Sequence, residues 1–132
     1  MEPRLRLLLD THALIWWLAG DDALGNNAKA AIADEANAIF VSAASAMEVA
    51  TKFRIGKLPS AALLAQDFER VVADQSFTEL PISVHHARLA GEMPIPHKDP
   101  FDRLLIAQAR AEDMVLVSNE AVFDGFGVRR IW

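Results

Sequence analysis

Five acidic side chains occupy positions from which they could bind a divalent metal ion. Asp10 closes an apolar stretch, and Glu48 lies in a segment rich in alanine. Asp99 and Asp102 flank the dipeptide Pro-Phe, and Glu120 follows a further apolar stretch. A carboxylate that leaves water without a counter-charge is costly. If these side chains converge, the sequence predicts a cation at that place, and we expect the cation to be the catalyst.

Each of these carboxylates also has a purely structural interpretation. Asp10 and Asp99 can each cap the helix that follows them. Glu48 can point outward and pair with Lys52 at i, i+4 spacing, and Glu120 can stand in the first turn of a short helix. For any one residue taken alone, the residue type and spacing leave both interpretations open.

Asp99 and Asp102 are three residues apart at the start of a predicted helix, and they therefore share one face. Two like charges this close raise each other's proton affinity unless a positive group lies nearby. The helix amino terminus supplies part of that compensation, and Arg103 could supply more. Asp102 heads an apolar stretch and is the stronger metal candidate, although the choice of direct ligand between the two stays open.

The remaining polar candidates are weaker. His97, next to a proline-bounded turn, could contact phosphate, orient Asp99 or simply belong to a surface loop. His85 and His86 are adjacent on a predicted helix and point apart, so a zinc site is not expected. Substrate contacts or support for the carboxylates are expected from a further set of side chains: Thr11, Lys52, His97, Arg103, Ser118 and Asn119.

Short apolar runs without alternation predict strands that are buried on both faces of a parallel sheet. Helical segments lie between these runs, which indicates a three-layer α/β domain with a mainly parallel sheet of four to five strands. The predicted strands are 5–9, 39–41, 77–82, 114–117 and 128–132. The predicted helices begin at Asp10 or Thr11, Asn26 or Asn27, Ser42, Ser60, Val84 and Pro100, and end near Ala19, Ala36, Arg54, Asp74, Gly91 and Glu112.

The carboxyl ends of parallel strands share one edge of a sheet, where functional residues of such folds gather. Asp10 lies directly at that edge, Glu48 lies in the second turn of a helix that leaves it, and Glu120 follows another strand. We therefore expect these three carboxylates to face one crevice.

The composition fits one domain that spans residues 1–132. The chain has 132 residues with 52% hydrophobic content, enough for a sizeable core. It contains no cysteine, which excludes a disulfide scaffold and thiolate metal ligands and fits a reducing cytoplasm. Its net charge of -5 argues against a broad basic surface that coats nucleic acid. No apolar segment is long enough for a membrane helix.

Four segments together resemble the PIN domain, and most closely the VapC-type toxins of bacterial toxin-antitoxin pairs. They are 7–16, 45–58, 97–109 and 116–123, in this order along the chain. The resemblance implies a metal-dependent ribonuclease whose acidic quartet is Asp10, Glu48, Asp102 and Glu120. Many members have Asp at the last place, so Glu120 is a departure. Asp99 belongs to a subgroup pattern and is interpreted as a supporting ligand.

The resemblance also implies cofactors and partners. Oxygen ligands favour Mg²⁺ or Mn²⁺, as one ion or two. The expected substrate is a structured RNA such as transfer or ribosomal RNA, cleaved to 5'-phosphate and 3'-hydroxyl ends. The expected partner is a VapB-type antitoxin, drawn electrostatically to the acidic cleft, and a homodimer is expected, with Trp16 and Trp17 as interface candidates.

Two alternatives of other kinds remain. One is a PIN-fold module that binds RNA or protein and cleaves little. The departure from Asp to Glu at position 120 favours this alternative. The other is a phosphatase or phosphotransfer domain with Asp10 as nucleophile. Haloacid-dehalogenase-like phosphatases need a second Asp two residues on, and His12 stands there instead.

Overall fold

A single parallel sheet organises the chain. The computed structural model describes residues 3–58 and 61–132. In this part of the chain, five strands pair in parallel in the order β3-β2-β1-β4-β5. This confirms the predicted α/β class with a parallel sheet. The strands are β1 (Arg6–Leu9), β2 (Ala38–Ser42), β3 (Thr78–Leu80), β4 (Val115–Val117) and β5 (Arg130–Ile131).

The central strand β1 is buried on both faces. Leu7 and Leu9 pack into the core on one side of the sheet, and Leu8 packs into a separate core on the other side. All three side chains have no exposed surface. Successive residues of a strand point to opposite faces, so an unbroken leucine run can fill both cores.

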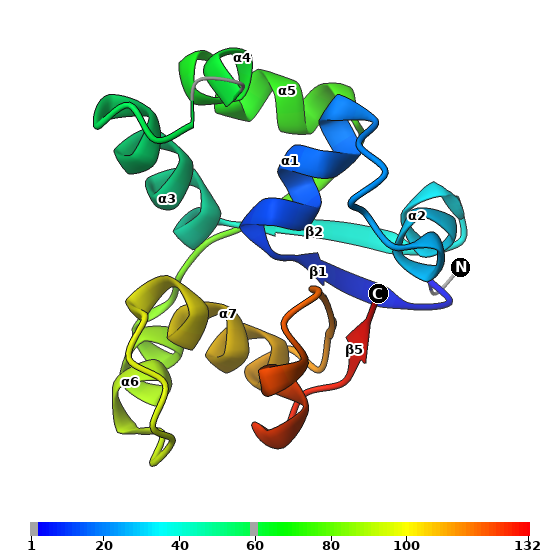
Figure 1. Cartoon of the computed structure of the whole chain (residues 1–132). Coiled ribbons are helices and arrows are strands. Elements are labelled where there is room, and N and C mark those ends of the chain that lie inside the picture. The colour runs from blue at the N-terminus through cyan, green and yellow to red at the C-terminus, as the bar shows by residue number, and fades with distance from the viewer. Residues whose placement is uncertain (1–2, 59–60) are drawn as a thin grey trace.

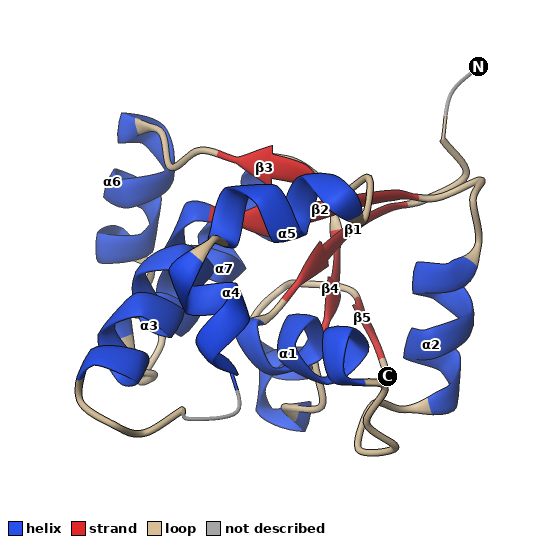
Figure 2. Ribbon diagram, turned by 90° about the horizontal axis from the view of Figure 1, so that it is seen from above, coloured by secondary structure: helices blue, strands red, loops and turns tan. Residues whose placement is uncertain are grey.

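Helices cover both faces of the sheet and complete three layers. Figure 1 shows α1 and α5 on one side and α6 and α7 on the other, and Figure 2 gives the view from above. No helix in the described ranges is long and apolar enough to cross a membrane. The helices are α1 (Thr11–Ala19), α2 (Asn26–Ala33), α3 (Ala43–Arg54), α4 (Ala62–Gln66), α5 (Phe68–Asp74), α6 (Val84–Glu92), α7 (Pro100–Ala111) and the 3-10 helix η2 (Ala121–Gly125).

Two helix predictions need correction. The helix predicted from Ser60 to Asp74 is two helices, because Asp67 adopts φ -145° and ψ 52° and separates α4 from α5. Its predicted cap, Ser60, lies outside the described residues. The helix predicted to be capped by Asn26 or Asn27 is preceded by Gly25 and ends at Ala33 rather than near Ala36.

Gly25 is required by a contact from the far end of the chain. A Cβ atom built on Gly25 would lie 2.6 Å from the backbone carbonyl carbon of Trp132 and 2.8 Å from its ring. No side chain fits at this distance, so glycine allows the segment before α2 to pack on the last residue of the chain.

The order of the strands creates a switch point beside β1. The chain moves from β1 to β2 and β3 on one side, then returns to place β4 and β5 on the other side. Loops that leave neighbouring strands in opposite directions open a crevice at their carboxyl ends. Asp10 follows β1 and Ser118 follows β4, so both lie at this point.

Candidate active site

Asp10 is a buried carboxylate at the centre of this edge. Its Oδ1 accepts a hydrogen bond from the Ala13 amide at 2.7 Å, so the predicted capping role is real. Its side chain is nevertheless costly to ionise. The pKa of Asp10 is raised from 3.8 to about 6. Burial is the main cause and the charge of Asp102 adds to it, while Ser118, the Ala13 amide and His12 act in the opposite direction. Capping and a chemical role are therefore compatible.

Asp102 lies in the first turn of α7 and is partly buried. Its Oδ2 lies 2.8 Å from Nε2 of His97, which precedes the helix. Burial raises the pKa of Asp102 above its usual value, and the charges of Asp99 and Glu120 act in the same direction, whereas the hydrogen bond from His97 lowers it. Asp102 thus feels the field of three other carboxylates, since it also raises the pKa of Asp10.

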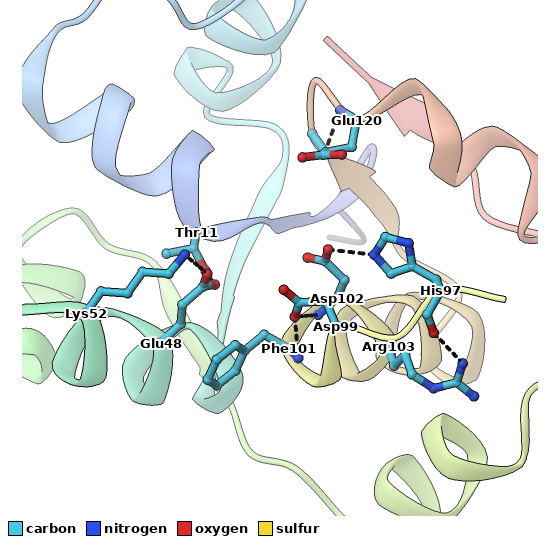
Figure 3. Close-up of polar contacts among 10 residues, drawn as sticks. Thr11, Glu48, Lys52, His97, Asp99, Phe101, Asp102, Arg103 and Glu120 are labelled. Carbon is cyan, nitrogen blue, oxygen red and sulfur yellow. Dashed lines mark hydrogen bonds and ion pairs between the residues drawn. The ribbon is translucent and has the colours of Figure 1, made fainter. Parts of the chain in front are cut away.

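Asp99 and Glu120 flank Asp102 at the surface. Asp99 caps α7, where its Oδ1 accepts from the amides of Phe101 and Asp102 at 2.9 and 3.1 Å. Glu120 is exposed, and its own amide donates to the Ser118 hydroxyl at 3.1 Å. Figure 3 shows the carboxylates of Asp102 and Glu120 on the same side of the site. Neighbouring Asn119 is also exposed.

Glu48 differs from these acids because its charge already has partners. It is only 7% exposed and lies on α3. Its Oε1 accepts from the Thr11 hydroxyl at 2.6 Å, and its Oε2 pairs with the Lys52 ammonium. Thr11 Oγ1 also lies 3.0 Å from Ser45 Oγ. Glu48 therefore faces inward, as a metal ligand would, while it makes the i, i+4 pair of the structural interpretation.

The acids affect one another's pKa values, but their side chains are not arranged as the ligands of one ion. The charges of Asp99 and Glu120 act on Asp102, and the charge of Asp102 acts on Asp10. Within residues 3–58 and 61–132, however, no three acidic or histidine side chains surround a common point as metal ligands would. Binding of an ion would require these carboxylates to turn toward one another.

The chemistry of the donors fits a hard divalent cation. Two partly or fully buried carboxylates have raised pKa values, and each is raised in part by the charge of another acid. A cation among them would remove this repulsion, and oxygen donors are those that Mg²⁺ and Mn²⁺ prefer. Asp10, which is buried, and Asp102, which is partly buried, are the candidates to hold it. Asp99 and Glu120 are the exposed acids whose charges act on Asp102.

Two arginines stabilise loops at this edge. Arg103, a candidate for contact with the acids or the substrate, points to main-chain carbonyls of the segment 90–97. Arg130 was not among the predicted site residues. It donates to the Ser118 carbonyl at 2.9 Å and forms a two-point ion pair with Asp124, so it secures the loop that contains Glu120. Its place in a short terminal strand gave no sequence signal.

His86 was also missed as a structural residue. It is buried, its Nδ1 accepts from the Ser83 amide, and its Nε2 lies 3.0 Å from Glu112. The capping pattern usually involves Glu or Gln at this helix position, which is why the sequence did not reveal it.

Comparison with known proteins identifies the family. The PIN domain family matches residues 7–128. A search of curated proteins found no match. Among solved structures, similar folds include VapBC2 of Rickettsia felis bound to a promoter DNA fragment, with 14% identity and a TM-score of 0.67 over 96% of this chain and 98% of that one. The Mycobacterium tuberculosis toxin VapC20, which cleaves the sarcin-ricin loop, has 18% identity and a TM-score of 0.67 over 92% and 95%.

A toxin-antitoxin complex from Klebsiella pneumoniae has 24% identity and a TM-score of 0.60, with 96% of each chain covered. At these identities the solved structures establish the fold, and the family match over nearly the whole chain establishes membership. The chain belongs to the PIN domain family.

Proposed function

We propose that this chain is a metal-dependent endoribonuclease and the toxin of a type II toxin-antitoxin pair. The observation that supports it most strongly is the burial of two carboxylates at the carboxyl edge of the sheet. Burial is the main cause of the raised pKa values of Asp10 and Asp102, and the charges of neighbouring acids add to it. A site of this kind favours a cation and, through it, a phosphate group.

In this proposal Asp10 and Asp102 hold Mg²⁺ or Mn²⁺, with Glu120, Asp99 and Glu48 as further ligands or as acceptors for its bound water. When bound, the ion would neutralise phosphate charge and make water a better nucleophile. Glu48 can contribute only if Lys52 gives up its ion pair.

The protein side chains hold the acidic groups in place. His97 donates to Oδ2 of Asp102, and Oδ1 of Asp102 has no hydrogen-bond partner among the described residues. The Ala13 amide fixes Asp10, and Thr11 fixes Glu48. Hydrolysis forms a bond between a water oxygen and phosphorus and breaks the bond from phosphorus to O3'. The 3' oxygen takes up a proton, which leaves 5'-phosphate and 3'-hydroxyl ends.

The proposed substrate is a structured RNA, either transfer or ribosomal RNA. One solved relative, VapC20, is described as a toxin that cleaves the sarcin-ricin loop, and this supports a structured target. The protein has a net charge of -5, so broad electrostatic attraction does not select RNA. We propose that recognition depends instead on RNA shape and on local contacts by Lys52, Asn119 and other side chains around the acids.

The proposed partner is a VapB-type antitoxin. Several solved relatives were determined as toxin-antitoxin complexes. A basic antitoxin side chain would compensate the charge of Asp10 and Asp102 much as a cation would. An apolar hollow of about 380 Å³ between α1 and α4, lined in part by Trp16, Leu18 and Leu64, offers apolar surface as well. We also propose a homodimer and a cytoplasmic location.

RNA cleavage and growth arrest test the proposed function together. We expect the purified chain to cleave RNA with Mg²⁺ or Mn²⁺ and to stop when the ion is chelated. Asp10→Asn should abolish cleavage and relieve growth arrest. Asp22→Asn should preserve cleavage and growth arrest, because Asp22 is a fully exposed acid whose ion pair is with Lys29. A toxic Asp10→Asn variant would contradict the enzymatic proposal.

A PIN-fold binding module with little cleavage is the second candidate. It is favoured by the ion pair that occupies Glu48 and by the exposed position of Glu120. RNA or protein binding without metal-dependent cleavage would support it. Sequencing RNA ends after brief expression would separate the two candidates, because only an active nuclease leaves defined new ends.

A further inference from the structure

The connection between α6 and α7 depends on one side chain. Residues 93–99 form no helix or strand, and Pro94 and Pro96 lack the amide that regular pairing needs. The carbonyls of this segment and of the end of α6 converge on the guanidinium of Arg103. It donates from Nε to Ala90 at 2.8 Å, from Nη1 to Ile95 at 3.1 Å and His97 at 2.7 Å, and from Nη2 to Met93 at 2.7 Å and Gly91 at 3.5 Å.

The planar guanidinium explains how one residue can hold so many carbonyls. It offers five N–H donors in a fixed fork, whereas a lysine ammonium offers three around a point. Arg103 lies in the first turn of α7, directly after Asp102. The same turn of helix therefore supplies both an acid of the site and the group that fixes the preceding segment.

His97 connects the carbonyl groups held by Arg103 to the carboxylate of Asp102. Its carbonyl accepts from Arg103, while its ring Nε2 lies 2.8 Å from Asp102 Oδ2. Figure 3 shows the two contacts on opposite sides of His97. Its ring also packs near Phe123 and Phe126, with centroids 5.7 and 5.8 Å away. The imidazole is thus fixed by its main chain, by its ring nitrogen and by two aromatic neighbours.

We propose that Arg103 is a positioning residue for the reaction, which acts through His97 on Asp102. By holding the segment 90–97, Arg103 keeps the His97 imidazole on one oxygen of Asp102, so that the other oxygen faces the site in a single orientation. Among the described residues, the guanidinium of Arg103 bonds to main-chain carbonyls and to no acid of the site. The inference rests on the proposed function, since it assigns Asp102 a part in cleavage.

Two simpler roles for Arg103 make different predictions. If Arg103 were a counter-charge for Asp102, then Arg103→Lys would preserve function because it preserves charge. If Arg103 only stabilised the fold, its loss would lower stability without a specific change at His97. The geometry instead connects Arg103 to the His97 ring through the main chain, and a change in that ring is the specific signature.

Nuclear magnetic resonance tests this signature without any need for cleavage. In metal-free parent protein, we expect a slowly exchanging ring Nε2–H signal from His97, assigned by its absence in His97→Gln. Arg103→Lys should remove or broaden this signal while the amide signals of β1 and β4 stay in place. The control is Arg88→Lys, because Arg88 is exposed on α6 and pairs with Glu92. A His97 ring signal that is unchanged in Arg103→Lys would overturn the proposal.

A double-mutant cycle on RNA cleavage tests the functional step. We expect Arg103→Lys and His97→Gln each to lower kcat by about 10-fold with little change in KM, as for groups that orient a metal ligand. The double variant should be no slower than His97→Gln alone, because both changes remove the same constraint. Independent, multiplying losses would show that Arg103 does not act through His97 and would overturn the proposal.

Folding and the proposed function are controlled separately. If the Arg103→Lys variant does not fold, the Arg103→Gln variant is used in both experiments instead. Its side-chain amide still offers two N–H donors. If both variants unfold the domain, Arg103 supports the whole fold, and the positioning role is overturned. If the parent folds but cleaves no RNA, the proposed function fails, while the resonance of His97 still decides whether Arg103 positions that ring.

Discussion

The carboxylates at the carboxyl edge of the sheet lie in two different electrostatic environments. On the side of α3, Glu48 is buried with Thr11 and Lys52, and its charge is compensated within the protein. On the side of β1 and α7, burial raises the pKa values of Asp10 and Asp102, and the side chains that lower them are Ser118, His12 and His97. Poorly compensated negative charge is therefore concentrated at Asp10 and Asp102, and a cation would be most stabilising there.

The largest expected effect is on activity, where the two sides should separate clearly. We expect Asp102→Asn to lower the cleavage rate by more than about 100-fold, because it removes a charge that nothing else at the site replaces. Glu48→Gln should cost only about 10-fold, because Glu48 is already engaged by Lys52. Rates at saturating Mn²⁺ measure both. Equal losses of cleavage rate in Asp102→Asn and Glu48→Gln would show that the two carboxylates do not differ in importance.

The next effect is on stability and follows from the pKa of Asp10. Since this pKa is raised from 3.8 to about 6, the protonated form adds stability that is fully present below pH 3.8 and is lost as the pH rises through 6. Asp10→Asn imitates the protonated form. At pH 7.5 without metal, we expect the variant to be more stable than the parent by about 2 to 3 kcal/mol, because one pKa unit corresponds to about 1.4 kcal/mol.

Denaturant unfolding from pH 4 to pH 8 in the presence of a chelator measures this difference. The gain should shrink toward zero near pH 4, where the parent is protonated as well. Saturating Mn²⁺ should stabilise the parent and not Asp10→Asn. A gain that does not depend on pH would mean that the burial of Asp10 is not its source.

A smaller effect is expected at Glu120. Its carboxylate is exposed, and it acts on Asp102 through charge. We therefore expect Glu120→Ala to lower the cleavage rate by about 10-fold, through weaker metal binding rather than loss of the site. A higher Mn²⁺ concentration should recover part of the rate. The matched control is Glu35→Ala, an exposed acid distant in sequence from every site residue. An unchanged rate would remove Glu120 from the site.

The smallest effect tests whether Glu48 can join the site at all. Lys52→Met keeps an apolar stem and removes the ammonium that now occupies Glu48. If Glu48 can bind the metal once Lys52 no longer pairs with it, Mn²⁺ should bind the Lys52→Met variant about threefold more tightly than the parent, because the competing ion pair is gone. Calorimetric titration of the metal gives the affinity. An unchanged affinity would assign Glu48 to the structure of α3 alone.

The fold was largely predictable because its signals are local. The leucines at positions 7–9 can only be buried on both faces, and Ser42 caps α3 as predicted. The two errors have different sources. Trp132 packs on Gly25 in front of α2, and nothing within the segment from 20 to 30 indicates that distant neighbour. The break between α4 and α5 lies in the backbone conformation of Asp67 alone.

The candidate site was predictable in its position and less so in its contacts. The carboxyl ends of parallel strands bring Asp10 and the loop of Glu120 to one edge, and charge links Asp102 to both. The partners of each side chain were not predictable. Arg103 stands beside two acids in the sequence, yet its guanidinium turns to carbonyls, because the direction of a long side chain depends on the packed surroundings.

The adjacency of β1 and β4 has a consequence for synthesis of the chain. These strands are hydrogen-bonded neighbours, although Leu9 and Val117 are far apart in sequence. A growing polypeptide therefore presents Asp10 long before α7 and β4 exist to enclose it. If the proposed function holds, RNA cleavage must await translation of α7 and β4, and a product that stops before them should be inactive.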